Sequence, residues 1–353
     1  MNLKWIFGIG VLATIIGFTA CKRDDDEPFV NRDFSRLYIA FSDYNPNDQG
    51  TQPVNIGVML RSDSTNFENT TSNFMYFESA TRGGNAITFN PAAQRVFMST
   101  INREPRDTVL QIFPVGPEGN LTNSGKIQNR HLKNVTGLVY YPSVDNLFAL
   151  DNANSTIAVY NRPKGRDRYM KVSQRFIITD DLKPWAIAIA GNIVYVTRTG
   201  ANGGIDIYDD VVSRKVDTLY NDVKASRRLT ISGSQNIQGM SLDTINNVLA
   251  VTDYTGSGTT AQGKILIFEN FSELAKQAGT ISPTRVIAGG QTGLIRPTDV
   301  ELDFKKDSKY LFVADPGAKA VYRFLKTATG DAKPDAKFVY GDSTPSGLSL
   351  DSR

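Results

Sequence analysis

The fold is decided by the stretch Arg296-Pro297-Thr298-Asp299-Val300-Glu301-Leu302-Asp303, followed by Tyr310-Leu311-Phe312-Val313-Ala314-Asp315 and then by Ala320-Val321-Tyr322-Arg323-Phe324. Each segment is short and rich in β-branched and aromatic residues, and Asp, Pro, Gly and Lys separate the segments. Alternation with a period of two residues is typical of β-strands and not of helices. The stretch therefore predicts three consecutive strands of one small sheet.

The same three-strand unit recurs along the chain at intervals of roughly 50 to 60 residues, a period typical of propeller blades. Each first strand begins with a small residue or Asp299 and continues as an apolar-x-apolar triplet. The first strands are Ala86–Phe89, Gly137–Tyr140, Ala186–Ile189, Gly239–Leu242, Asp299–Leu302 and Gly347–Leu350. The second strands of the first five units are Val96–Met98, Leu147–Ala149, Val194–Val196, Leu249–Val251 and Leu311–Val313. The third strands are Val109–Phe113, Thr156–Tyr160, Ile205–Tyr208, Ile265–Phe268 and Ala320–Phe324.

The two ends of the repeated region complement each other. Gly347–Leu350 is a first strand with no second strand after it, whereas Leu37–Phe41 is a second strand with no first strand before it. Pairing of these two segments would close a ring and remove open sheet edges. The predicted fold class is therefore all-β, a six-bladed β-propeller closed by a C-terminal innermost strand that joins the N-terminal blade. A seventh blade would have to lie in Arg214–Ile231, where no triplet occurs.

The N-terminal segment is typical of a secretory signal. Lys4 precedes the apolar run Trp5–Ala20, which is too short to span a bilayer comfortably. The exit Phe18-Thr19-Ala20-Cys21 resembles the lipobox of bacterial lipoproteins, with Phe18 where that family usually has Leu, and Cys21 is the one cysteine of the chain. The resemblance implies cleavage before Cys21 and its acylation, which anchors the protein stably in a membrane. An ordinary signal peptide followed by an incidental cysteine is the alternative.

Three regions are expected: residues 1–20 as a lipoprotein signal peptide, 21–35 as the lipidated cysteine with an acidic tether, and 36–353 as the propeller. The tether opens with Lys22-Arg23-Asp24-Asp25-Asp26-Glu27-Pro28, typical of a solvated spacer. It also resembles the signal by which some Gram-negative bacteria export lipoproteins to the outer face of the outer membrane. We therefore expect a lipid-anchored protein at the cell surface, with a periplasm-facing domain as the alternative.

The composition excludes several classes of function. Lys and Arg number 39 against 36 Asp and Glu, a net charge of +3, and removal of the leader with Lys4 leaves 38 − 36 = +2. A net charge so close to zero produces no strong positive electrostatic field to attract the phosphates of nucleic acid, and we expect no nucleic-acid partner. One Cys and one His exclude a disulfide framework and a Cys/His zinc cluster. The single imidazole, His131, is expected in a loop or outer strand away from the axis.

The stretch from Arg296 to Phe324 resembles an NHL repeat, and Leu147–Tyr160 is a weaker copy of it. At the level of blades the resemblance covers the whole chain after the tether. It implies the six-bladed propeller superfamily that also contains TolB-like and gluconolactonase-like proteins. That superfamily includes hydrolases, lyases and binding modules, so the resemblance implies a fold and not an activity.

In propellers of this type, the loops that enter the first strands share one face with the loops that join second to third strands. Side chains on these loops converge there although they are distant in sequence. The candidate ligand-binding residues are Asp299, Asp253, Asp315, Asn236, Gln238, Trp185, Tyr254, Arg198 and Asn152. Asp299 is singular because the other five first strands have Gly or Ala at its position. Structural roles are open as well: Asp299 could cap a turn and pair with Arg296, Asp151, Asp253 and Asp315 could cap turns, and Trp185 could be buried between blades.

Aromatic and cationic groups on one rim suit stacking on a sugar ring or anchoring of a protein. We therefore expect a monomeric, non-catalytic surface lipoprotein that needs no cofactor and binds a ligand, glycan or protein partner through its loop-rich face. The alternative, implied by the resemblance, is a metal-dependent gluconolactonase-like hydrolase. Its Ca²⁺-like ion would use Asp299, Asp253 and Asp315 with amides such as Asn236 or Gln238. The acidic residue that this family places in the first blade's inner strand is absent, because Ser346 and Gly347 stand there.

Overall fold

The computed structural model describes residues 35–44, 54–79, 81–101, 109–122, 125–179, 181, 183–214 and 221–353. The expected signal peptide, Cys21 and almost all of the tether lie outside these residues. No helix in the described ranges is long and apolar enough to cross a membrane.

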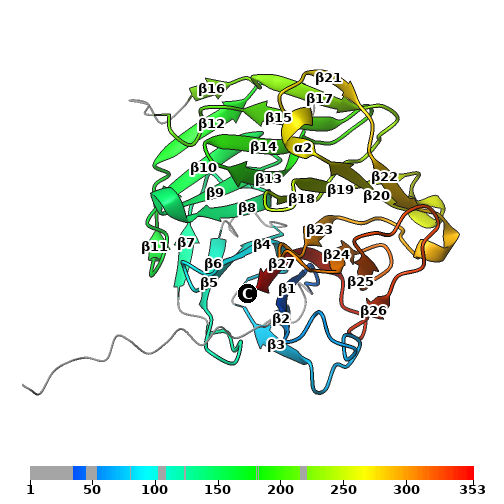
Figure 1. Ribbon diagram of the computed structural model, residues 1–353. Helices are drawn as coiled ribbons and strands as arrows, with labels where there is room; N and C mark the ends of the chain where they lie inside the picture. Colours follow the sequence, from blue (N-terminus) through cyan, green and yellow to red (C-terminus); the bar gives the residue numbers. More distant parts are fainter. Residues whose placement is uncertain are drawn as a thin grey trace, which may run out of the picture. The chain divides into compact units, whose positions relative to one another are not determined.

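The strands form six small sheets, which we number as blades 1 to 6 (Figure 1). Blade 1 contains β27 (Pro345–Ser352), β1 (Ser35–Phe41), β2 (Val54–Met59) and β3 (Phe74–Glu78). Blade 2 contains β4 (Gly84–Asn90), β5 (Arg95–Thr100), β6 (Val109–Pro114) and β7 (Gly125–Gln128). Blade 3 contains β8 (Val135–Tyr141), β9 (Asn146–Asp151), β10 (Thr156–Asn161) and β12 (Gln174–Ile178).

The remaining blades have the same order of strands from the axis outward. Blade 4 contains β13 (Pro184–Ala190), β14 (Ile193–Arg198), β15 (Gly204–Tyr208) and β17 (Arg227–Ile231). Blade 5 contains β18 (Met240–Asp243), β19 (Val248–Thr255), β20 (Gln262–Glu269) and β22 (Arg285–Ala288). Blade 6 contains β23 (Asp299–Leu302), β24 (Tyr310–Asp315), β25 (Ala320–Leu325) and β26 (Ala336–Phe338). All six predicted first strands are the innermost strands, and the six-bladed fold class is confirmed.

Short strands in the outer connections link neighbouring blades. β11 (Asp167–Tyr169), in the connection between β10 and β12, pairs in parallel with β7 of the preceding blade. β16 (Asn221–Val223) joins β12 and β21 (Gly279–Ile281) joins β17 in the same way. Within the described ranges the helical pieces are single turns: η2 (Pro142–Val144), η3 (Gly258–Thr260), α2 (Phe271–Leu274) and η4 (Gly290–Thr292). The segment Arg214–Ile231, considered above for a seventh blade, contributes β16 and β17 to blades 3 and 4.

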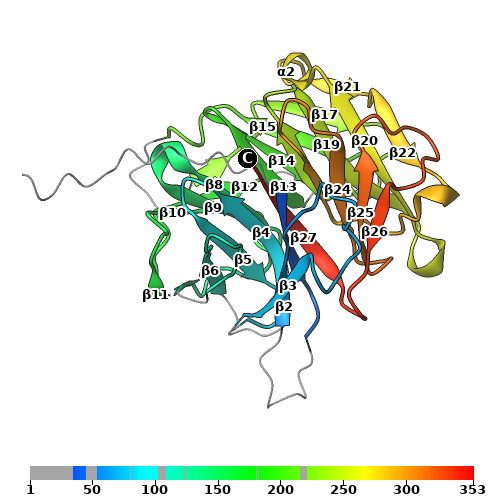
Figure 2. The same ribbon diagram turned by 60° about the horizontal axis from the view of Figure 1, so that its bottom comes forward.

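The ring is closed by the C-terminal strand. β27 and β1 are antiparallel neighbours, and their register runs from Ser35 opposite Ser352 to Ala40 opposite Gly347. Figures 1 and 2 both show β27 and β1 side by side although they come from opposite ends of the described chain. The predicted closure is therefore confirmed.

The core lies between the faces of adjacent blades. Val300 of blade 6 packs with Ile265 of blade 5, while Phe312 on the other side of blade 6 packs with Leu37 and Phe67 of blade 1. All five side chains are fully buried. Burying one such side chain contributes about 1.5 to 3 kcal/mol. Because the adjacent blades cover these side chains, each sheet depends on its neighbours for this part of its stability.

Small residues let the inner strands approach closely around the axis. A Cβ added at Gly347 would lie 2.3 Å from the carbonyl oxygen of Asn85 in blade 2, and one at Gly239 would lie 2.4 Å from the Cα of Asp299. The template position therefore has to stay small at these inter-blade contacts, as the sequence pattern indicated.

The ring has two ends, the mouth face and the turn face. The mouth face is the end at which the inner strands begin, near Asn85, Thr136, Trp185, Thr298 and Ser346. The turn face is the opposite end, where the inner strands finish and hairpin turns lead to the second strands. The loop with η3 joins β19 to β20 on the mouth face.

Candidate functional site

A partial circle of side-chain hydrogen bonds surrounds the mouth and links five pairs of neighbouring blades. Hydroxyl or amide groups at the mouth donate to backbone carbonyl groups of the next blade. The donors and acceptors are Asn85 Nδ2 to Val135 (2.9 Å), Thr136 Oγ1 to Trp185 (2.6 Å), Thr197 Oγ1 to Gln238 (2.7 Å), Thr298 Oγ1 to Ser346 (2.9 Å) and Ser346 Oγ to Gly84 (3.0 Å). These polar side chains therefore have a structural task at the mouth.

A cavity of about 180 Å³ opens inside this circle. All six blades contribute to its lining, which includes Thr136, Trp185, Thr298, Asp299 and Ser346. The predicted convergence of the entering loops thus brings Trp185 and Asp299 to one cavity. Trp185 is half-buried, because it also packs against the core cluster between blades 4 and 5.

A second cavity of about 230 Å³ continues along the axis between the six inner strands. Its walls combine apolar side chains of the inner strands with polar groups, among them the hydroxyl groups of Thr88, Ser241 and Ser349. Two carboxyl groups, those of Asp299 and Glu301, also line it. Asp299 lines both cavities and therefore stands where the mouth passes into the axial channel.

The environment of Asp299 favours its neutral form. Burial raises the pKa of Asp299 to about 7, although hydrogen bonds from the backbone N–H groups of Leu348 and Val300 lower it. The N–H of Leu348 donates to Oδ2 at 2.8 Å and that of Val300 to Oδ1 at 3.0 Å. The carboxyl group therefore accepts hydrogen bonds from backbone amides of β23 and of the closing strand β27, where the sequence had suggested a turn cap paired with Arg296, and it also borders both cavities.

Glu301 is a channel residue that the candidate set missed. Burial raises the pKa of Glu301 well above its usual range, and the nearby charge of Asp299 raises it further. Ser241 Oγ of the neighbouring blade donates to Glu301 Oε2 at 3.0 Å, which lowers that pKa. The period of two along β23 would have found Glu301, because residues two apart lie on the same face of a strand.

The aspartates at the ends of second strands cap loops of their own blades. Asp315 accepts backbone hydrogen bonds from Ile295 (2.6 Å), Arg296 (3.0 Å) and Ala318 (3.0 Å) and is fully buried. Burial raises the pKa of Asp315, and these hydrogen bonds oppose the rise. The entering loop is thus tied to the end of the second strand.

Asp253 and Asp151 repeat this arrangement. The backbone N–H of Asn236 donates to Asp253 Oδ1 at 2.6 Å, and Lys264 Nζ lies 3.0 Å from Asp253 Oδ2. Asp151 accepts from the N–H groups of Lys133 (2.8 Å) and Asn134 (3.1 Å). The turn-capping reading of these positions therefore holds in blades 3, 5 and 6.

The structure does not bring Asp299, Asp253 and Asp315 together as metal ligands. In the ranges described, no group of three or more His, Cys, Asp or Glu side chains is placed to hold a metal ion. Asp253 and Asp315 direct their oxygens at backbone amides and Lys264 and not toward Asp299. The donor set expected for a Ca²⁺-like ion is thus not assembled by these residues.

Arg198 does not lie on the rim. It is 3% exposed, and its guanidinium forms an ion pair with Asp206 on the adjacent strand β15. The sequence pattern missed this pairing because Asp206 stands among the apolar residues of a buried strand.

The remaining candidates support loops and line neither cavity. Asn152 Nδ2 donates to the carbonyl group of Pro184 in the next blade at 2.6 Å. Asn236 Nδ2 donates to the carbonyl group of Tyr254 at 3.0 Å, and Gln238 is buried with its backbone bonded to Thr252. His131 is exposed ahead of β8, away from both cavities, as expected.

Comparison with known proteins supports the fold. No family model and no curated protein matches the chain. A chain in the crystal structure of a nidogen/laminin complex is 14% identical with a TM-score of 0.55, and the match covers 90% of this chain and 98% of that chain. A putative 6-phosphogluconolactonase from Bacteroides uniformis is 13% identical with a TM-score of 0.50, covering 91% and 100%.

Hydrazine synthase of Kuenenia stuttgartiensis also matches, at 15% identity and a TM-score of 0.51, over 77% of this chain and 91% of that chain. The three proteins differ in what their names say they do, and identities this low show a shared architecture alone. The class defined by fold and site is a six-bladed β-propeller with a small mouth cavity that leads into an axial channel containing two carboxyl groups.

Proposed function

We propose that this protein is a lipid-anchored β-propeller of the bacterial outer membrane, related to the NHL and TolB-like propellers, that binds a ligand or protein partner without catalysis. The mouth cavity carries the proposal. Its rim side chains are largely occupied in inter-blade hydrogen bonds, whereas Trp185 and Asp299 turn to the cavity as well. A rigid rim around one aromatic and one acidic group is suited to recognition.

The size of the cavity limits the ligand. Ligand pockets for drug-sized molecules are typically about 300 to 1,000 Å³, and the mouth cavity is smaller at about 180 Å³. It suits one sugar ring or one side chain inserted by a protein partner. The indole of Trp185 would supply a stacking surface, and the carboxyl group of Asp299 would accept hydrogen bonds or donate one when protonated.

The pKa of Asp299 favours one alternative. A carboxyl group with a pKa of about 7 is suited to general acid–base catalysis near neutral pH, which keeps a gluconolactonase-like hydrolase as the second candidate. The metal-dependent form of that activity lacks support from the carboxylates described above, because they do not form a common donor set. Binding therefore remains the preferred function.

Affinity capture from envelope extracts tests the proposal. Wild-type protein and the variants Trp185→Ala and Asp299→Asn would be compared with Tyr169→Ala and Glu273→Gln, which alter an exposed aromatic and an exposed acidic residue outside both cavities. We expect the same partner or glycan with wild type and controls, and a loss of about tenfold with the mouth variants. Equal recovery by folded mouth variants would contradict the proposal, and turnover of a lactone abolished by Asp299→Asn would favour the hydrolase.

A further inference from the structure

The chain enters the propeller at the turn face. Ser35, the first residue of β1, pairs with Ser352 near the end of the innermost strand β27. Inner strands finish at the turn face, so β1 begins there and runs toward the mouth. The tether predicted from the sequence is thus attached to the end of the ring opposite the cavity.

Exposed apolar side chains gather on the same face. Six large hydrophobic residues are exposed in the described part of the chain, and four of them lie at the turn face: Val144, Ile245, Phe304 and Leu325. The first three are in turns between inner and second strands, and Leu325 ends β25, which runs in the same direction as the inner strand. Ile245 is the most exposed of the six at 70%. Ile245, Phe304 and Leu325 belong to the adjacent blades 5 and 6.

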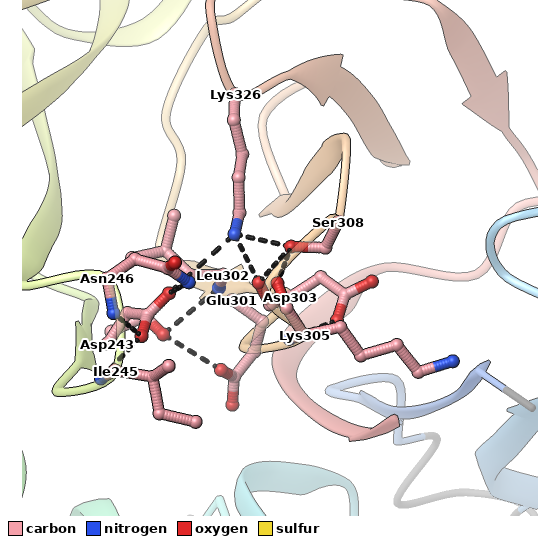
Figure 3. Close-up of polar contacts among 10 residues, drawn as sticks. Asp243, Ile245, Asn246, Glu301, Leu302, Asp303, Lys305, Ser308 and Lys326 are labelled. Carbon is pink, nitrogen blue, oxygen red and sulfur yellow. Dashed lines mark hydrogen bonds and ion pairs between the residues drawn. The ribbon is translucent and has the colours of Figure 1, made fainter. Parts of the chain in front are cut away.

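A network of polar contacts fixes these turns in place (Figure 3). Lys326 Nζ lies 2.6 Å from Ser308 Oγ and 3.6 Å from Asp243 Oδ2, and it also donates to the carbonyl group of Asp303. Asp243 in turn accepts backbone hydrogen bonds from Ile245 at 3.0 Å and Asn246 at 2.9 Å. The turns of blades 5 and 6 are thus joined through one lysine, and their apolar residues are held out on a rigid support.

Cationic residues accompany the apolar ones. The turn Phe304–Lys309 contains three lysines and one aspartate, and Lys306 and Lys309 are exposed. In blade 3, Lys164 Nζ lies 3.9 Å from Oδ1 of Asp145, the residue that follows Val144. Apolar side chains flanked by lysines are suited to the interface between lipid headgroups and acyl chains, where anionic lipids attract each lysine.

We propose that the turn face, through Ile245, Phe304 and Leu325 with their flanking lysines, rests on a membrane surface containing anionic phospholipids. The inference depends on the proposed lipid anchor. The thirteen residues Lys22–Phe34 extend to at most about 45 Å. A tether of this reach limits the distance between the propeller and the membrane but leaves the orientation of the propeller free. Contacts of the turn face with lipid therefore set that orientation. The mouth cavity then opens away from the membrane.

Fluorescence quenching of the lipidated full-length protein in vesicles tests this orientation. Cys21 is the only cysteine of the chain, so its acylation leaves an introduced thiol as the single site for a dye. Thr244→Cys places the dye on the turn face beside Ile245, and Ala201→Cys places it on the mouth face between β14 and β15. The vesicles would contain phosphatidylethanolamine and phosphatidylglycerol at about 3:1, with brominated acyl chains as the quencher.

We expect strong quenching at position 244 and little at position 201. Ile245→Glu combined with Phe304→Glu should reduce the quenching at 244 about threefold or more, because two charged groups oppose insertion at the interface. Tyr169→Glu combined with Val339→Glu alters exposed residues elsewhere and should leave it unchanged. Equal quenching at both positions, or stronger quenching at 201, would overturn the inference. Failure of the wild-type protein to float with the vesicles would instead overturn the lipid anchor.

Discussion

The carboxyl group of Asp299 accepts a 2.8 Å hydrogen bond from the backbone N–H of Leu348. Asp299 begins the inner strand of blade 6, and Leu348 lies in β27, the strand that closes the ring. The one acidic residue at the template position thus links the last complete blade to the closing strand while it borders both cavities. The same hydrogen bond therefore helps to close the ring and holds the carboxyl group of the candidate site in place.

Replacement of Asp299 by Asn should change how stability depends on pH. The pKa of Asp299 is raised by burial to about 7, so its contribution to stability is fully present below the unfolded-state pKa of about 4 and is lost as pH rises through 7. The loss should be on the order of 2 kcal/mol, because the open channel partly screens the charge. Denaturant unfolding at pH 4.5 and 8 should show a smaller decrease for Asp299→Asn than for wild type. An unchanged decrease would mean that Asp299 is ionised throughout.

Gly347→Ala should destabilise the ring. The added Cβ would lie 2.3 Å from the carbonyl oxygen of Asn85, so the backbone of blade 1 or blade 2 has to move. We expect a loss of about 2 to 3 kcal/mol in the free energy of unfolding. Gly290→Ala is the matched control, since nothing lies within 4 Å of a Cβ at that exposed position. Equal stability of the two variants would show that the inner strands are not packed as described.

The repeated pattern predicted much of the fold because propeller strands obey local rules. Period-two alternation located every inner strand, and the unpaired segments at the two ends predicted that β27 would join β1. The parallel additions β11, β16 and β21 were not predicted. Each of these strands is three residues long and pairs through its backbone with a neighbouring blade. Backbone pairing requires no particular side chains, so the sequence shows no pattern for these strands.

The candidate site was predicted less well than the fold. Trp185 and Asp299 do line one cavity, because the start of an inner strand fixes its position at the mouth. Arg198 was predicted at the rim but pairs with Asp206 in blade 4, because the two residues lie diagonally on the same face of the neighbouring strands β14 and β15. Glu301 was not predicted, because it departs from the template position, although the period of two along β23 places it on the same face as Asp299.

Asp315→Ala should destabilise the protein whether or not Ca²⁺ is present. The variant leaves the N–H groups of Ile295, Arg296 and Ala318 without their acceptor, which should cost about 2 kcal/mol. Asp342→Ala, at a fully exposed carboxylate, is the control. Thermal unfolding with and without Ca²⁺ should give the same midpoint for wild-type protein. A rise of the midpoint with Ca²⁺ that disappears in Asp315→Ala would restore this carboxylate as a metal ligand.

Cys21→Ser should release the protein from the membrane. If Cys21 carries acyl chains, each buried methylene contributes about 0.8 kcal/mol, and the contacts of the turn face alone are too weak to replace them. Detergent-phase partitioning should find wild type in the detergent phase and the variant in the aqueous phase. Retention of Cys21→Ser in the detergent phase, in protein whose mass shows that the leader has been removed, would contradict the lipid anchor.

The pairing of β1 with β27 supports every other conclusion, because it places the mouth residues of six blades in one circle. A direct test introduces Ser35→Cys and Ser352→Cys, at directly opposed positions of these strands, into the Cys21→Ser protein. Mild oxidation should give an intramolecular disulfide in nearly all molecules, detected as a mobility shift and as protection of both thiols. Free thiols, or cross-linking only between molecules, would show that the two ends do not pair and that the proposed mouth is not formed.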